Sequence, residues 1–203
     1  MPGAPEGQVK ARPSGTRIAR ILLESLAGWI TRRPVPGTSG GVRLPHSSEL
    51  RLIIVVLAAV ESVTALLVSG MLPPEIKPPH AAFEMLLVLT ALGAAAATAR
   101  HPHLVSSSQL ILRTGFLGEL AVPRDCVRSA SRVLQTIKGR GPRPVPGDPD
   151  AMACSVLSTV NVRVELDPPV HVDLPGTGKR AVRRIYFSTD SPDVVPGVVR
   201  RTG

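Results

Sequence analysis

The stretch LIIVVLAAVESVTALLVSGML at residues 52–72 decides how the rest of this chain is interpreted. A second apolar run, AAFEMLLVLTALGAAAATA, follows at residues 81–99. Each run is close to the ~20 residues that an α-helix needs to cross ~30 Å of hydrocarbon. The Pro-rich segment 73–80 between them cannot continue a helix. The sequence therefore predicts two membrane-spanning helices that form a hairpin within residues 50–99.

The first run is apolar enough to insert although Glu61 lies near its middle. Its twelve Leu, Ile and Val residues together favour insertion by about 4–7 kcal/mol, whereas a central acid costs ~2.5–3.5 kcal/mol. The second run is weaker because residues 94–97 are all Ala, so we expect it to pack against the first. A buried hairpin inside a soluble domain is the alternative, but no remaining segment is apolar enough to surround it.

The basic residues predict the orientation. Residues 1–51 hold eight Lys and Arg, the segment between the runs holds only Lys77, and residues 100–203 hold fifteen. Because segments rich in Lys and Arg stay in the cytoplasm, we expect both termini there. The twenty Arg against four Lys are typical of a GC-rich bacterial genome. The net charge of +9 then indicates apposition to an anionic leaflet of a bacterial cytoplasmic membrane.

Glu61 shares a helical face with the small residues Ala58, Ala65 and Ser69, and small residues mark helix contacts in membranes. Thr90 is expected at a similar depth on the second helix. One interpretation is a polar clasp between Glu61 and Thr90 that locks the hairpin or a homo-oligomer. The alternative is a membrane component, also oligomeric, that handles protons or a small solute through Glu61.

The first fifty residues divide into three predicted segments. Residues 1–15 are expected to be a disordered tail and residues 34–49 a linker, since both are rich in Pro, Gly, Ser and Arg. Residues 16–33 have the spacing of an amphipathic helix with one apolar stripe. We expect this helix to lie in the membrane interface; packing on the soluble domain is the alternative. The stripe contains Ile18, Ile21, Leu22, Leu26 and Trp29.

Residues 103–203 change to a period of two, which predicts strands. Turns are expected at residues 114–118, 167–169 and 175–178, and a mobile loop at 139–149. Asp190 and the following Ser-Pro-Asp are typical of a helix start. The expected fold is a cytoplasmic antiparallel β-barrel or sandwich with a short carboxy-terminal helix. Its strands are predicted at residues 109–113, 119–122, 127–133, 156–166, 170–174 and 181–188.

Two segments of this region carry a family resemblance. They are HPHLVSSSQLILRTGFLGELAVPRDCVRSA at residues 101–130 and VRRIYFSTDSPDVV at residues 182–195. With the two spans before them, they resemble small actinobacterial two-pass membrane proteins that carry a bacterial pleckstrin-homology-like domain. The resemblance covers roughly residues 17–195 and implies a fold and a location rather than an activity.

A basic cluster is the main candidate for binding. Lys179, Arg180, Arg183 and Arg184 lie in or beside one predicted hairpin, and each cation near an anionic membrane is worth about 1 kcal/mol. We expect contact with anionic lipid or a partner protein; a merely solvated patch is the alternative. The adjoining PGTGKR at 175–180 lacks the first glycine and the final Ser or Thr of a phosphate-binding loop.

Other chemistry finds little support in the sequence. His101 and His103 have no accompanying Cys or acid cluster, and Cys126 and Cys154 suit core positions in a reducing compartment. We expect no metal or cofactor and no enzymatic activity. Five scattered aromatic residues give no platform for nucleic acid. Membrane lipids and an unidentified protein are the expected partners of a scaffold or regulatory protein.

Overall fold

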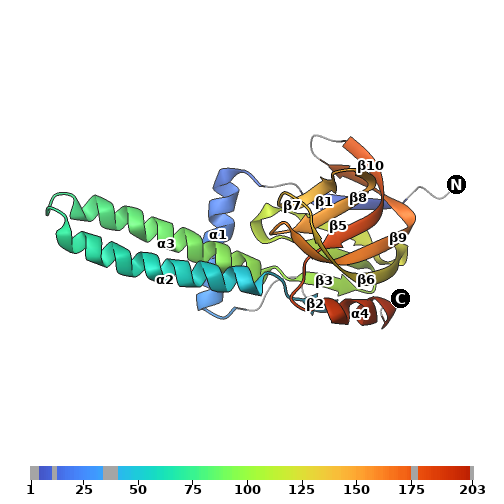
Figure 1. Cartoon of the computed structure of the whole chain (residues 1–203), viewed down its shortest axis with the longest axis horizontal. Helices are drawn as coiled ribbons and strands as arrows, with labels where there is room; N and C mark the ends of the chain where they lie inside the picture. Colours follow the sequence, from blue (N-terminus) through green and yellow to red (C-terminus); the bar gives the residue numbers. More distant parts are fainter. Residues whose placement is uncertain (1–4, 11–12, 34–40, 175–177, 202–203) are drawn as a thin grey trace.

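The computed structural model describes residues 5–10, 13–33, 41–174 and 178–201. These residues form four α-helices, ten β-strands and three short 3-10 helices. Two long antiparallel helices project from one side of a β-domain, and a third helix crosses the base of their hairpin (Figure 1). A helical hairpin joined to a sheet domain agrees with the sequence prediction at this level.

The hairpin consists of α2 (Ser48–Met71) and α3 (Lys77–Arg100). Helix α3 begins earlier than predicted because Pro78 and Pro79 occupy its first turn, where a missing N–H costs nothing. Each helix has 24 residues, about 36 Å at 1.5 Å per residue. The most apolar windows have mean hydropathies of 2.5 and 1.7, and only 6% and 28% of them are buried. By length and composition both helices could therefore cross a membrane.

The two long helices meet along the face of α2 that carries its small residues, as the sequence predicted. Ala58 is buried, and Ser62, Ala65 and Ser69 are half-buried at the same helical spacing. The opposite faces of α2 expose Leu, Ile and Val side chains. This pattern leaves a continuous apolar surface around the hairpin, which water solvates poorly.

Helix α1 (Gly15–Ile30) packs across α3. Gly93 lets it approach closely, since a Cβ there would lie 3.0 Å from Leu22 Cβ. At the end of α3, Arg100 Nη1 donates to the carbonyl oxygens of Gly28 and Arg33, both at 2.8 Å. Part of the apolar stripe of α1 thus packs on the hairpin. Packing of this helix on the hairpin was not among the expected arrangements.

The β-domain is built from one mixed sheet in the order β2-β3-β4-β5-β1-β9-β10-β8-β7, with β6 paired to β9. The pairs β1–β9 and β8–β10 are parallel, so the expectation of a purely antiparallel barrel or sandwich is wrong. The strands are β1 (Glu6–Lys10), β2 (Gly41–Leu44), β3 (His103–Ser106), β4 (Gln109–Arg113), β5 (Glu119–Pro123), β6 (Val127–Thr136), β7 (Gly141–Val145), β8 (Asp148–Ser155), β9 (Thr159–Leu174) and β10 (Gly178–Phe187).

Strands β1 and β2 lie where the sequence predicted a tail and a linker. Strand β1 is inserted between β5 and β9, and β2 pairs with β3. Gly7 makes the insertion possible, because a Cβ there would lie 3.0 Å from side-chain atoms of both Val170 and Val172. The sequence predicted a β-domain made of residues 103–203 alone, and the structure shows that this prediction is wrong. The β-domain needs two strands that precede the hairpin.

Two predicted loops are also strands. The expected loop at 139–149 contains all of β7 (141–145) and the first residues of β8 (148–155), which pairs with it. The expected turn at 167–169 lies within β9, opposite a break in the β10 register between Val182 and Arg184. Prolines can occupy that position because the irregular segment makes no regular ladder there. The expected turn at 175–178 lies largely outside the described residues.

Helix α4 (Val195–Arg201) closes the β-domain against β6. It follows the 3-10 turn Pro192–Val194 and buries Val195 and Val199 in the main core. The buried Arg124 donates to the carbonyl oxygens of Val127 and Val199, which fixes the helix end to the sheet. The short terminal helix agrees with the sequence prediction.

Candidate functional site

The start of α2 is held by a residue from the far end of the chain. Asp190 Oδ1 accepts a hydrogen bond from the backbone N–H of Ser48 at 3.0 Å. Asp190 Oδ2 also lies 3.7 Å from the Arg51 guanidinium. A carboxylate at a helix start satisfies an otherwise unpaired N–H and complements the helix dipole. Asp190 therefore caps a hairpin helix, rather than the carboxy-terminal helix that the sequence predicted for it.

The residue before Asp190 joins the same two parts of the molecule. Thr189 Oγ1 donates to Pro45 O at 2.8 Å, and the Asp190 N–H donates to the same carbonyl at 2.9 Å. Asn161 of β9 bonds the Thr189 backbone twice, through Nδ2 to its carbonyl and through Oδ1 from its N–H. The segment that enters α2 is thus tied to β9 and to the end of β10.

Two buried histidines complete this junction. The rings of His46 and His103 stack with centroids 4.5 Å apart, and Phe187 meets His103 edge-on at 5.3 Å. His46 directly precedes the hairpin, and His103 begins β3 just after it. The segment that enters α2 and the segment that leaves α3 therefore meet in one aromatic stack.

The hydrogen bonds define a neutral His103, and burial favours the neutral form of His46 as well. His46 Nε2 donates to His101 O at 3.0 Å while Nδ1 accepts from Ser47 Oγ at 2.8 Å. His103 Nε2 donates to Ser188 O at 2.9 Å while Nδ1 accepts from the Arg113 N–H at 3.0 Å. Burial lowers the pKa of His46 and takes the pKa of His103 well below its ordinary value. His103 Nδ1 is already occupied by an N–H donor, so that ring has no place for a second proton, and burial disfavours the charged form of both rings.

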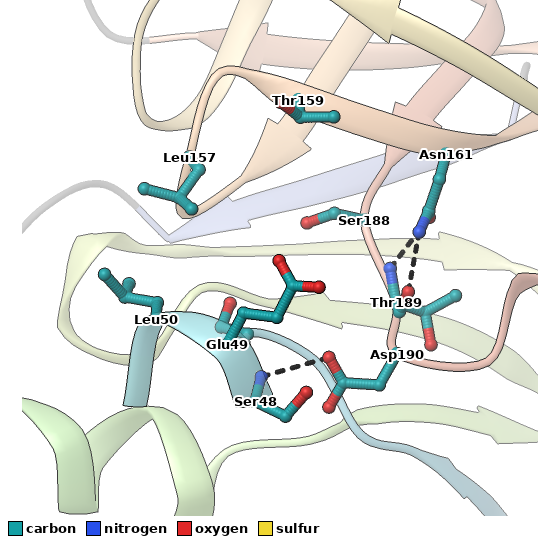
Figure 2. Close-up of a pocket in the computed structure, with 10 residues that line it drawn as sticks. Ser48, Glu49, Leu50, Leu157, Thr159, Asn161, Ser188, Thr189 and Asp190 are labelled. Carbon is teal, nitrogen blue, oxygen red and sulfur yellow. Dashed lines mark hydrogen bonds between the residues drawn. The ribbon is translucent and has the colours of Figure 1, made fainter. Parts of the chain in front are cut away.

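A cleft of about 230 Å³ lies beside the junction. Figure 2 shows Glu49 between the start of α2 and the strand segments that carry Thr159 and Ser188. Its polar lining includes the carboxylates of Glu49 and Asp190 and the hydroxyls of neighbouring Ser and Thr residues. Asp190, Thr189 and Asn161 are already engaged in holding the two parts together. The arrangement suits a structural junction better than a reaction centre.

The described residues contain no cluster of three or more His, Cys, Asp or Glu that could hold a metal ion. His101 and His103, the sequence candidates for such a site, instead bond to backbone groups. Cys126 and Cys154 are both buried and free.

The structure does not join the two residues of the predicted membrane clasp. Glu61 is half-buried on the α2 face that meets α3, whereas Thr90 is exposed. Thr90 Oγ1 donates to Leu86 O within its own helix at 2.7 Å. In the described hairpin, no hydrogen bond links Glu61 to Thr90.

The predicted basic cluster lies along β10, and two of its four members already have acidic partners. Lys179 Nζ is 3.2 Å from Glu6 of β1, and Arg184 Nη2 is 2.8 Å from Asp148 of β8. Arg180 is half-buried and Arg183 exposed. Strand β10 begins at the top of the β-domain in Figure 1 and ends at Phe187, which contacts His103 at the junction. These ion pairs weaken the cluster as a site for anions.

Sequence reasoning missed the junction residues His46, Arg51 and Thr189. A partial signal existed, since His46 and His103 flank the two apolar runs at nearly equal distances. Two histidines placed symmetrically about a hairpin are brought together when its ends meet. The roles of Arg51 and Thr189 had no local pattern, because their partners lie far away in the sequence.

Compared with protein-family models, with curated proteins and with solved structures, the chain matches none of them.

Proposed function

We propose that this chain is a non-enzymatic integral membrane protein whose β-domain is a binding module held at the membrane surface. Its ligand is a partner protein or an anionic lipid, and its role is that of a scaffold or regulator. The pleckstrin-homology-like character of the domain belongs to this proposal. It is supported by the long antiparallel β9–β10 pair and by the terminal helix on β6.

The observation that carries the proposal is the exposed apolar hairpin. Its surface is formed by large side chains such as Leu66 and Phe83, both well exposed. Burying such side chains is worth roughly 1.5–3 kcal/mol each, so lipid would stabilise this part of the molecule strongly. The junction of His46, His103 and Asp190 then keeps the β-domain close to one membrane face.

The orientation in the proposal follows the basic residues. Arg51 lies in the first turn of α2 and Arg100 in the last turn of α3, at the hairpin ends nearest the β-domain. The opposite end carries only Lys77. This asymmetry supports a bacterial cytoplasmic membrane with the β-domain and both termini on the cytoplasmic side.

Binding rather than catalysis is supported by the junction. Its carboxylate, hydroxyl and imidazole groups are committed to interactions that join the hairpin to the sheet. A general base or nucleophile needs an available lone pair beside a substrate. The lone pairs of Asp190 and His103 already accept hydrogen bonds from within the protein.

The proposal is tested by purifying the full chain from bacterial membranes in mild detergent and identifying what remains bound. We expect one protein or one class of anionic lipid to be enriched over the bulk membrane composition. Recovery of lipids in bulk proportion, with no protein at a constant ratio, would contradict the binding role.

A further inference from the structure

A second cavity lies between α1 and the β-domain. Its volume is about 630 Å³. It opens beneath the first turns of α1 and above the strands β1, β4 and β5. The side chains that determine its chemistry are Lys10, Arg17, Ile21, His101, Arg113 and Glu119.

The charges in this cavity favour an anion. Lys10 Nζ donates to Glu119 Oε1 at 3.0 Å, and Arg113 Nε donates to Oε2 at 2.9 Å. Burial alone would raise the pKa of Glu119, but these hydrogen bonds outweigh it and hold that pKa below its ordinary value. One carboxylate therefore faces three cations. The third, Arg17, is exposed and has no acidic partner among the residues that the structure describes.

The start of α1 adds to the positive potential. Pro13 and Ser14 line the same cavity. The first turn of α1 contains no acid, and the Ser14 side chain does not cap it. The free amide ends of a 16-residue helix therefore lie beside Arg17 and favour negative charge.

The cavity also lies at the depth of lipid headgroups. His101, which lines it, directly follows the last residue of α3, and headgroup regions extend about 5–8 Å beyond each side of the hydrocarbon. Helix α1, whose first turns line the cavity, crosses the base of the hairpin (Figure 1).

The exposed side of α1 is consistent with this depth. Ile21 lines the cavity, and Gly28 contacts Arg100 at the end of α3, so this side of α1 faces the cavity and the base of the hairpin. Leu23 and Ile30, which are 62% and 71% exposed, project from nearly the opposite side of the helix at 100° per residue. They therefore project away from the cavity and give α1 an exposed apolar surface, as a helix in the membrane interface needs.

We propose that the cavity beneath α1 binds the phosphate of an anionic membrane lipid, with Arg17 as its main contact and with Lys10 and Arg113, both paired with Glu119, beside it. This inference rests on the proposed function, because it requires the hairpin to be in a membrane. It assigns lipid recognition to the base of the hairpin rather than to the basic residues of β10.

The test uses the full chain in micelles of a neutral detergent, titrated with phosphatidylglycerol and followed by native mass spectrometry. Phosphatidylcholine and inorganic phosphate form parallel arms. We expect phosphatidylglycerol to be retained in preference to phosphatidylcholine, and inorganic phosphate to compete only weakly. Arg17→Gln should weaken phosphatidylglycerol binding about fivefold, the effect of one cation near an anionic surface.

Arg20→Gln is the matched control. Arg20 is on the same helix and equally cationic, but it pairs with Glu24 at 2.7 Å and does not line the cavity. Its substitution should leave binding unchanged. Arg17 is exposed, so both variants should fold, which the thermal midpoint without added lipid verifies.

Four results would overturn the inference. Equal losses in the two variants would mean diffuse surface attraction instead of a site. Inorganic phosphate that binds as tightly as the lipid would mean a site for soluble anions. Unchanged phosphatidylglycerol binding in the Arg17→Gln variant would place lipid recognition elsewhere and leave the proposed function intact, whereas no anionic preference in the wild type would count against a lipid ligand altogether.

Discussion

Asp190 Oδ1 accepts a hydrogen bond from the Ser48 N–H at 3.0 Å, although 142 residues separate the two positions. This bond connects the end of the β-domain to the first residue of a hairpin helix. Together with the Thr189 hydrogen bond and the stacked rings of His46 and His103, it holds the two parts in their relative placement.

Replacing Asp190 with Ala should lower the stability of the full chain by about 1–2 kcal/mol, the usual cost of losing a helix cap. Thermal unfolding in detergent micelles measures this. Asp193→Ala is the control, because Asp193 only forms an exposed pair with Arg132 at 3.0 Å and should cost less than about 1 kcal/mol. Equal effects of the two substitutions would contradict the capping role.

The histidine pair predicts a stability that depends on pH. An unfolded histidine has a pKa of about 6.5, and the folded pKa values of His46 and His103 are lower. Above pH ~6.5 the stabilisation is fully present. As the pH falls the unfolded state takes up protons first, so stability should fall by up to about 1.4 kcal/mol per pH unit for each proton.

Unfolding midpoints between pH 7.5 and 5.5 check this prediction. His103→Gln should lower stability at pH 7.5 and flatten the pH dependence. His171→Gln, a histidine substitution on β9 away from the junction, should keep the wild-type slope. A His103→Gln variant with the wild-type slope would show that the pH dependence arises elsewhere.

Gly93 should be intolerant of larger residues because Leu22 of α1 packs directly on it. Gly93→Leu should cost about 1–3 kcal/mol through overpacking and displace α1. Trp29, the only tryptophan, lies on that helix and reports the displacement as a change in fluorescence emission. Gly70→Leu on α2 is the control, since nothing lies within 4 Å of its added Cβ; an equal emission change there would refute the packing.

Glu61→Gln should change stability by less than about 1 kcal/mol, because the amide keeps the shape of the side chain on the α2–α3 face. Glu61→Leu should insert at least as well, since it removes a polar cost of ~2.5–3.5 kcal/mol, but should alter oligomerisation or stability. Thermal midpoints and size in micelles measure both. Loss of a pH-dependent proton or solute flux in the Gln variant, with folding intact, would instead support the relay.

The fragment 103–203 should not fold alone, because it lacks β1 and β2. Its circular dichroism should have little sheet signal and a broad or absent melting transition. A chain in which a short Gly/Ser linker joins Ser47 to His101 retains both strands and should melt cooperatively. Cooperative melting of the fragment itself would mean that β1 and β2 are both dispensable.

The parts of the fold that sequence predicts are those determined locally. Apolar runs of membrane length, the amphipathic stripe of α1 and the alternation in β4 and β5 each identify an element without reference to its partners. Strand β1 has no such signal, since five residues with Gly7 among them become a strand only between β5 and β9. Strand β9 continues through Pro168 because β10 is irregular opposite it, which no local pattern reveals.

The candidate sites divide in the same way. Asp190 has the local pattern of a helix start, yet its hydrogen-bond partner is in another helix. The cations of β10 form a cluster in sequence, but Glu6 and Asp148 reach them through the sheet topology. Arg17, Lys10 and Arg113 come from three separate elements, so their common cavity becomes visible only after folding.

Cysteine labelling tests most directly the claim that the hairpin crosses the membrane with the β-domain on the cytoplasmic side. Maleimide labelling of the wild-type protein should be low, because both of its cysteines are buried. Burial also raises the pKa of Cys154 to about 12, which leaves little reactive thiolate. The variants are Met71→Cys at the hairpin tip, 87% exposed, and Leu134→Cys on β6, 83% exposed. An impermeant maleimide on intact spheroplasts should label Met71→Cys, and label Leu134→Cys only after permeabilisation. Labelling of both variants only after permeabilisation would contradict a membrane-crossing hairpin, and labelling of Leu134→Cys alone in intact spheroplasts would contradict the orientation.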